Sequence, residues 1–188
     1  WALAAGGEGE DIASGITLDD TNLPYISGSF TGTWADFDGT NLSGDNGIDH
    51  DLFVARLTPT GFWVWALEAT GDGDQVGQSI AIDSSGNAYV TGFIEGNSTF
   101  DSTLTQCKGK DVFIAKVNNG GTWGWVEHIE GDGDDYGRGL AIDSEDGIHI
   151  TGQHSNYSQF GMVNLTAGFG PEVFVAKISN TGTWQWAV

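Results

Sequence analysis

The hexapeptide GFWVWA at residues 61–66 returns as GTWGWV at 121–126 and as GTWQWA at 182–187. The second tryptophan of each copy, together with Trp1, gives four anchors that are 64, 60 and 61 residues apart. Self-similarity at a fixed period indicates a repeat architecture, in which each unit packs on its neighbours. We therefore predict three units at residues 1–64, 65–124 and 125–188, with the extra residues of the first unit around 45–51 and a duplicated strand at the end of the third. Other landmarks keep this register: Asp19, Asp83 and Asp143; Gly28, Gly92 and Gly152; Phe53, Phe113 and Phe174.

Each unit has the pattern of short β-strands and shows no helical period. In the second unit, SIAID at 79–83 and AYVTGF at 88–93 flank the turn sequence SSGN, which is typical of a hairpin. A long polar loop is expected next, then the strand DVFIAKV at 111–117 and a strand over 122–129. Four strands that are apolar on both faces, in a unit of about 60 residues, fit a propeller blade better than a β-solenoid coil or a sandwich.

These strings resemble a known family. DSSGNAYVTGF at 83–93, DVFIAKV at 111–117 and the G-x-W-x-W-A joint are similar to the bacterial and archaeal β-propeller repeat called SBBP. The resemblance covers all three units. It implies an all-β fold of three four-stranded propeller-type blades, in a secreted or cell-surface protein.

The number of blades leaves two arrangements open. Propellers close with about four to eight blades, so three blades do not form a ring. Either neighbouring blades lie on a longer chain, or several copies of this chain join. In the second case the strands at Trp1 and Trp186, which occupy the same repeat position, would associate by β-strand addition between copies. The expected partners are therefore neighbouring blades or the chain itself.

The charge of the chain excludes several classes of protein. There are 26 acidic and six basic side chains among 188 residues, a formal net charge of −20. Such a chain cannot neutralise nucleic-acid phosphates, and an anionic membrane surface repels it. No apolar run approaches the roughly 20 residues that span a bilayer. The eight tryptophans indicate a folded domain, and the single cysteine excludes an internal disulfide and a Cys-rich zinc site.

An acidic loop recurs in every unit, as GEGED at 7–11, GDGD at 71–74 and GDGDD at 131–135. Alternate carboxylates separated by glycine can turn several oxygens towards one hard cation, so we predict calcium binding here. A calcium loop would carry an oxygen ligand where Val76 and Tyr136 stand, and the alternative is a solvated turn. The predicted ligands are Glu8, Glu10, Asp72, Asp74, Asp132 and Asp134. No other cofactor is expected.

Half of the six cations occupy one strand position. These are Arg56, Lys116 and Lys177, each five residues after an acid: Asp51, Asp111 or Glu172. A basic side chain on a buried sheet needs a partner, so we expect a recurring ion pair between strands or blades, with a substrate-binding ring of cations as the alternative. The aspartates that end the first strand of each unit should cap its turn.

Seven of the eight tryptophans belong to the repeated joint, where large aromatic side chains serve packing between blades. Trp34 falls in a long loop instead. With Asp36, and with Tyr157 in the third unit, it is the predicted contact for an exposed ligand such as a surface glycan. Four N-x-S/T sequons predict glycosylation in the polar loops, at Asn41, Asn97, Asn156 and Asn164.

Motifs of catalysis are missing from the sequence. There is no nucleophile elbow, HExxH, Walker loop or dinucleotide fingerprint, so we predict that the protein is not an enzyme. The predicted function is a structural or adhesive repeat module outside the cell or on its surface. The alternative is a lectin-like propeller module that binds glycans or another ligand.

Overall fold

The computed structural model describes residues 1–45 and 47–188; Asn46, in the predicted insertion at 45–51, lies outside the described residues. Every regular element in this part of the chain is a β-strand, which confirms the all-β class. The described residues include no helix that is long and apolar enough to cross a membrane. The strands form four antiparallel sheets, one of eight strands, one of four and two of three.

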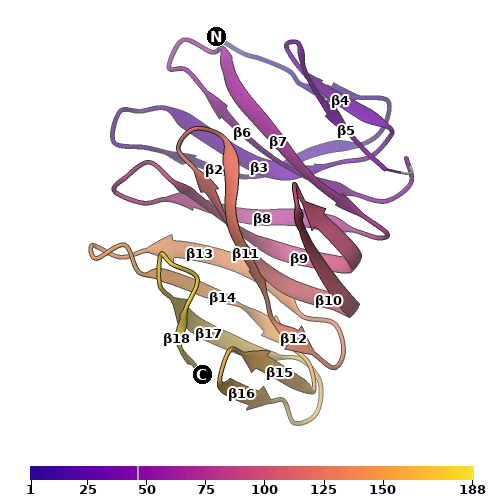
Figure 1. The fold of residues 1–188 in the computed structure, drawn as a ribbon, viewed down its shortest axis with the longest axis vertical. Helices are drawn as coiled ribbons and strands as arrows, with labels where there is room; N and C mark the ends of the chain where they lie inside the picture. The colour runs from indigo at the N-terminus through magenta and orange to yellow at the C-terminus, as the bar shows by residue number, and fades with distance from the viewer. Residues whose placement is uncertain (46) are drawn as a thin grey trace.

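Three sets of four strands repeat along the chain, and we call them layers 1, 2 and 3 (Figure 1). Layer 1 contains β2 (Asp11–Leu18), β3 (Pro24–Phe30), β6 (Asp51–Leu57) and β7 (Trp63–Gly71). Layer 2 contains β8 (Gln75–Ile82), β9 (Ala88–Phe100), β10 (Thr103–Asn118) and β11 (Thr122–His128). Layer 3 contains β13 (Tyr136–Ile142), β14 (Ile148–His154), β17 (Glu172–Ile178) and β18 (Trp184–Ala187). In each layer the strands pair in chain order, and two residue pairs between β7 and β9 join layers 1 and 2 into the eight-stranded sheet.

The segments predicted as long polar loops are hairpins, which corrects that expectation and moves Trp34 from a loop to the first residue of a strand. We call residues 34–43, 97–106 and 157–166 the outer hairpins. They consist of β4 (Trp34–Phe37) with β5 (Thr40–Ser43), the distal halves of β9 and β10, and β15 (Tyr157–Phe160) with β16 (Val163–Thr166). Each pairs with the residues that follow a Trp-x-Trp joint or its equivalent: β1 (Gly6–Gly7), the end of β7, and β12 (Glu130–Gly131).

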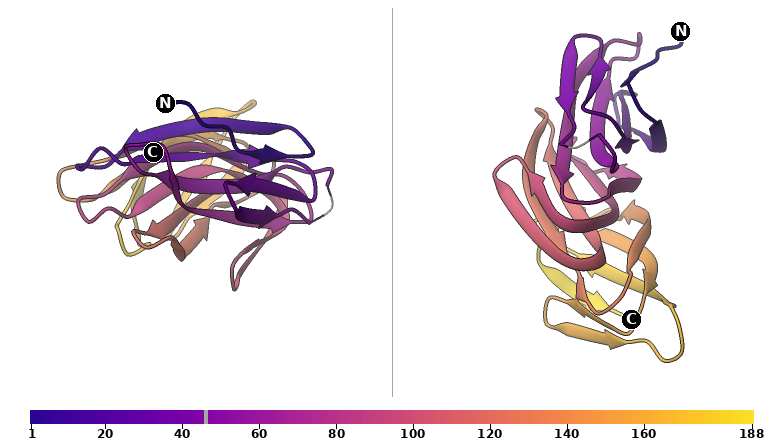
Figure 2. Two further views of the ribbon diagram at one scale, coloured as in Figure 1. Left: turned by 90° about the horizontal axis from the view of Figure 1, so that it is seen from above. Right: turned by 90° about the vertical axis from the view of Figure 1, so that its right-hand side faces the viewer.

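The layers pack face to face, and each interface has its own apolar core. Between layers 1 and 2 lie Leu52 and Val54 against Ile80 and Val90. The core between layers 2 and 3 holds Val112 and Ile114 against Ile148 and Ile150. Layer 2 is thus buried on both faces, because alternate residues of β10 point into different cores. The layers follow one another along the long axis on a curved path, and the described chain does not close into a ring (Figure 2).

A tryptophan-on-glycine contact recurs between successive units. The ring of Trp65 in layer 1 lies over Gly121, in the last turn of layer 2, where an added Cβ would stand 2.6 Å from the ring. Trp125 lies over Gly182 of layer 3 in the same way, and Trp1 lies over Gly61. The φ angles of these three glycines are between +79° and +82°, in the left-handed region that favours glycine. Each turn therefore needs glycine both for its backbone and for the ring above it.

We expect Gly121→Ala to lower the free energy of unfolding by roughly 2–4 kcal/mol, since it adds a strained φ and a clash with Trp65. Gly120→Ala is the matched control, because nothing lies within 4 Å of a Cβ at that position. Urea unfolding of both variants measures the difference. Equal losses in the two variants would contradict the contact.

Candidate functional site

The aspartates predicted to cap the first turn of each unit do so in all three. Oδ1 of Asp83 accepts backbone N–H groups from Ser85 and Asn87, both at 2.9 Å. Asp19 and Asp143 accept the equivalent pairs at 2.8–2.9 Å. Two N–H groups bonded to one carboxylate oxygen hold the turn closed, so these acids have a structural role.

The cations at the shared strand position contact these capping aspartates in two units. Lys177 Nζ lies 2.7 Å from Asp143 Oδ2, and Arg56 Nη2 lies 3.8 Å from Asp19 Oδ2. Hydrogen bonds with Lys177 and His149 hold the pKa of Asp143 well below its ordinary value. Lys116 instead donates to the carbonyl of Asn180 at 3.4 Å, across the interface between layers 2 and 3. The three cations thus contact residues of turns. Among the described residues, no ion pair joins them to the acids five residues before them.

The predicted calcium ligands lie in the turns that lead into each layer. In the second loop, Asp74 Oδ2 accepts a hydrogen bond from Lys110 Nζ at 3.0 Å, and its Oδ1 lies 3.3 Å from His50 Nδ1. Burial opposes ionisation of Asp74, but hydrogen bonds from Lys110 and His50 outweigh it and lower the pKa. The ammonium group of Lys110 already pairs with the Asp74 carboxylate and would compete with a metal ion for it. Calcium binding by Glu8 and Glu10, by Asp72 and Asp74, and by Asp132 and Asp134 stays a prediction.

Two acids at equivalent positions of β6 and β10 are buried. Asp51 on β6 is 0% exposed and Asp111 on β10 is 3% exposed. Burial raises the pKa of each carboxyl to about 7. Glu172 holds the same place on β17 but is exposed. One repeat position therefore gives two buried carboxyls and one solvated carboxylate.

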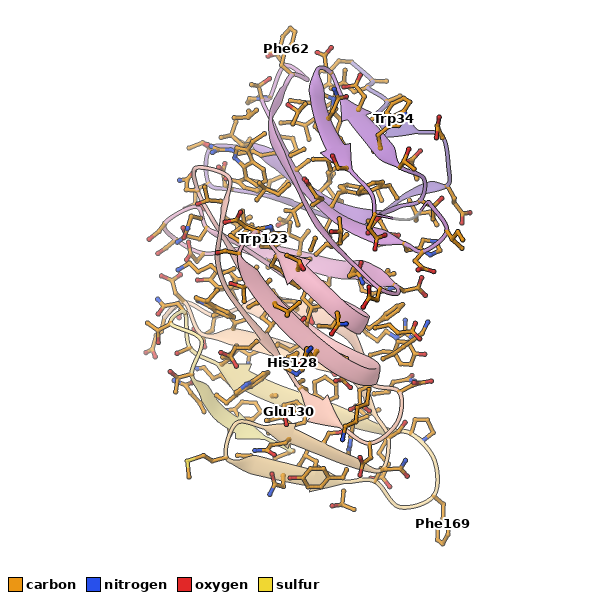
Figure 3. All side chains as sticks on the ribbon, turned by 45° about the vertical axis from the view of Figure 1, so that its right-hand side comes forward. Trp34, Phe62, Trp123, His128, Glu130 and Phe169 are labelled. Atoms are coloured by element: carbon orange, nitrogen blue, oxygen red, sulfur yellow. The ribbon has the colours of Figure 1, made fainter. Side chains whose placement is uncertain are left out.

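A cluster of three different side chains surrounds the second of these acids. One ligand atom each of Cys107, Asp111 and His128 lies within 4.8 Å of the other two. Cys107 sits where the pairing of β9 and β10 shifts register, between Gln106 and Lys110, and His128 ends β11 (Figure 3). Burial raises the pKa of the Cys107 thiol and lowers that of His128. It is the one such group of three potential metal ligands among the described residues.

An open groove adjoins this cluster. It is lined by Gln106, Cys107, Lys108, Asp111, Glu130, Gly131, Asp132 and Tyr157. Figure 3 shows His128 and Glu130 near one another, where β11 runs on towards β12. The repeat pattern does not reveal this site, because neither Cys107 nor His128 recurs. What distinguishes layer 2 is a departure from the repeat: opposite the shared phenylalanine, β7 has Glu68 where β11 has His128.

The predicted ligand contacts occupy equivalent places on separate outer hairpins. Trp34 and Tyr157 each lie directly before the two residues that pair with β1 or β12, and they are 41% and 37% exposed. Asp36 accepts the Gly39 N–H at 2.7 Å, within its own turn. The structure places Trp34 with Asp36 in one unit and Tyr157 in another, so they do not converge on one pocket.

The sequon asparagines lie on or beside the outer hairpins, and all are exposed. Asn41 and Asn164 hold equivalent positions, paired with Asp36 and Gln159. Asn97 donates through Nδ2 to Asp72. Exposure on the outer hairpins leaves room for a glycan, and modification of Asn41, Asn97, Asn156 and Asn164 stays a prediction.

The two end layers carry uncovered apolar surfaces. The C-terminal face comprises Val173, Val175 and Trp186, and the N-terminal face comprises Ile16 and Leu18. Val173 and Val175 are 76% and 37% exposed, whereas their equivalents in layers 1 and 2 are fully buried. Trp1 is exposed apart from its contact with the turn at Gly61.

Comparison with known proteins agrees with these repeated layers. Residues 64–98, from β7 through the β8–β9 hairpin, match the Beta-propeller repeat family SBBP. The chain is also 27% identical over 108 residues, 53% of its length, to an uncharacterized WD repeat-containing protein of Acanthamoeba polyphaga mimivirus. That match spans 8% of the viral protein. The resemblance to the SBBP repeat is confirmed, and the chain is a β-repeat module.

Replacement of Asp51 by asparagine tests the buried carboxyl of layer 1. Its pKa rises from 3.8 to about 7 on folding, so the folded state holds a proton that the unfolded chain releases. The free energy of unfolding therefore falls as the pH rises from 4 to 7, by up to about 4 kcal/mol from this group. Asp51→Asn should reduce that fall.

Urea unfolding at a series of pH values measures the slope. The exposed Asp20→Asn variant removes the same charge and should keep the wild-type slope. An unchanged slope in Asp51→Asn would contradict the assignment.

Proposed function

We propose that the protein is a non-enzymatic β-propeller module in which layers 1, 2 and 3 are successive four-stranded blades. The SBBP match, the four-stranded antiparallel meander of every layer and the curved path of the stack support this. The blades would span residues 11–71, 75–128 and 136–187, so each predicted unit boundary falls next to or within the fourth strand. No reaction is assigned to the module.

The observation that carries the proposal is the contrast in burial between equivalent residues. Val54 of layer 1 packs in one core with Ile80 of layer 2, and both are buried. Val175 and Ile16 hold the same two places at opposite ends of the stack, and both are exposed. The C-terminal face of one copy is therefore shaped for the N-terminal face of another, and two copies would supply six blades, within the range of about four to eight at which propellers close.

A location outside the cell or on its surface belongs to the same proposal. It is supported by the SBBP match, since the resemblance to that family implies secreted or surface proteins. Four exposed sequon asparagines and a net charge of −20 agree with a solvated, glycosylated surface. A structural or adhesive role is part of the same proposal.

Light scattering after size exclusion tests the assembly. We expect the wild-type chain to have the mass of two or more copies at micromolar concentration. The double variant Val173→Gln with Val175→Gln should be monomeric, because burying two amides without partners opposes association. Met162→Gln, which changes a fully exposed residue away from the C-terminal face, is the control and should associate like the wild type. A folded wild-type monomer would contradict the proposal.

Glycan binding by the outer hairpins is the second candidate. It is favoured by the placement of two exposed aromatic side chains, Trp34 and Tyr157, at one repeat position. Aromatic faces that are open to solvent can stack on sugar rings. Several equivalent weak sites in one assembly would also raise avidity.

A glycan array with the wild-type chain tests this candidate, and Trp34→Ala should lower the signal at least about tenfold if one ring stack of 1.4 kcal/mol or more is lost. Phe62→Ala is the control, since this exposed ring lies outside the outer hairpins. Equal binding by the two variants, or an empty array, would refute the role of Trp34.

A further inference from the structure

The cluster around Asp111 on β10 is a set of side chains that the propeller architecture does not require. Layer 1 has a buried acid at the same place, Asp51, but the residue opposite the shared phenylalanine there is Glu68 instead of a histidine. Layer 3 has the exposed Glu172. Cys107, Asp111 and His128 come together in one layer only, so packing common to all layers does not account for them.

We propose that Cys107, Asp111 and His128 bind a divalent transition-metal ion of the zinc type. Their ligand atoms lie within 4.8 Å of one another. Zinc binds sulfur at about 2.3 Å and nitrogen or oxygen at about 2.0–2.2 Å, so tetrahedral ligands stand roughly 3.3–3.8 Å apart. Small rotations of three side chains would bring these atoms to that spacing. His128 at the end of β11 and Cys107 at a register shift are placed where such adjustment does not disturb a regular ladder.

One unpaired oxygen of the Asp111 carboxyl independently indicates a cation. This side chain is 3% exposed, and its Oδ1 has no hydrogen-bond partner in the described part of the chain. A buried carboxylate oxygen without a partner is costly, and a metal ion removes that cost. The neighbouring Lys110 does not fill this role, because Asp74 and Glu95 engage its ammonium group.

The donor set selects the ion. A thiolate, an imidazole and a carboxylate together suit zinc and related transition metals, whereas calcium and magnesium prefer oxygen donors alone. Three protein ligands leave a fourth position, and the groove lined by Glu130 and Asp132 opens beside the cluster. Water or a carboxylate from this groove would complete the coordination. The site is distinct from the calcium predicted in the acidic loops, because its ligands are different residues.

Cobalt is the probe for this site, since a cobalt–thiolate bond gives a charge-transfer band in the near ultraviolet. Cys107 is the single cysteine of the chain, so the band reports one residue. We expect the wild-type protein to show the band on titration with Co²⁺ and to lose it when Zn²⁺, but not Ca²⁺, is added. Cys107→Ser should abolish the band.

His128→Gln should weaken Co²⁺ binding by at least about tenfold, because even the loss of an outer partner of a metal ligand costs that much. Two control variants should bind like the wild type. Gln106→Ser changes a groove residue beside Cys107, and Glu68→Gln changes the position in layer 1 that corresponds to His128. Circular dichroism confirms that each variant is folded.

Absence of the band in the folded wild type would overturn the proposal. Equal affinity of His128→Gln and Gln106→Ser, or displacement of Co²⁺ by Ca²⁺ as readily as by Zn²⁺, would do so as well. The measurement is independent of assembly, because all three ligands belong to layer 2 of one chain.

Discussion

The contact between a tryptophan ring and the glycine turn of the next unit is the interaction on which the layered structure depends. A glycine with φ near +80° at this turn has no Cβ, and the ring of Trp65 or Trp125 occupies the space that a side chain would need. The ring spans the interface at one edge of the layers, and this fixes how closely two sheets approach. Once that spacing is set, alternate residues of each central strand meet the neighbouring sheet, and the two apolar cores form.

Burial on both faces makes each layer dependent on its neighbours. A valine that moves from water into such a core contributes about 1.5–3 kcal/mol, so layer 2 gains on both sides what the end layers gain on one. The C-terminal end layer lacks one neighbour. There Val173 and Val175 keep the sequence pattern of a buried strand, although nothing in the described chain covers them. The apolar pattern on this open face is the basis of the proposed association between copies, in agreement with the nearest-neighbour energetics of repeat proteins.

The repeat period, the strands and the capping aspartates could be predicted from sequence because each of them recurs and has a local cause. The outer hairpins could not. Residues 97–106 are polar, and their strand character depends on a pairing with β7 that brings Thr70 opposite Thr99. Only in that pairing does it become clear that Ser98 and Phe100 face inward while Asn97 and Thr99 face solvent. The Cys107 and His128 cluster was hidden for a related reason: the two residues lie on different strands, and only the register of β10 with β11 brings them together.

The acid position shared by the third strands of the layers shows how surroundings can differ on one repeated backbone. All three layers place an acid there, and the surroundings decide its state. Burial raises the pKa of Asp51 in layer 1 to about 7, and Glu172 in layer 3 is exposed. In layer 2 the equivalent carboxyl lies beside a thiol and an imidazole. A buried acid at a shared position, together with two further side chains nearby, would form the proposed metal site. The rest of the sheet interiors remains apolar enough to stack.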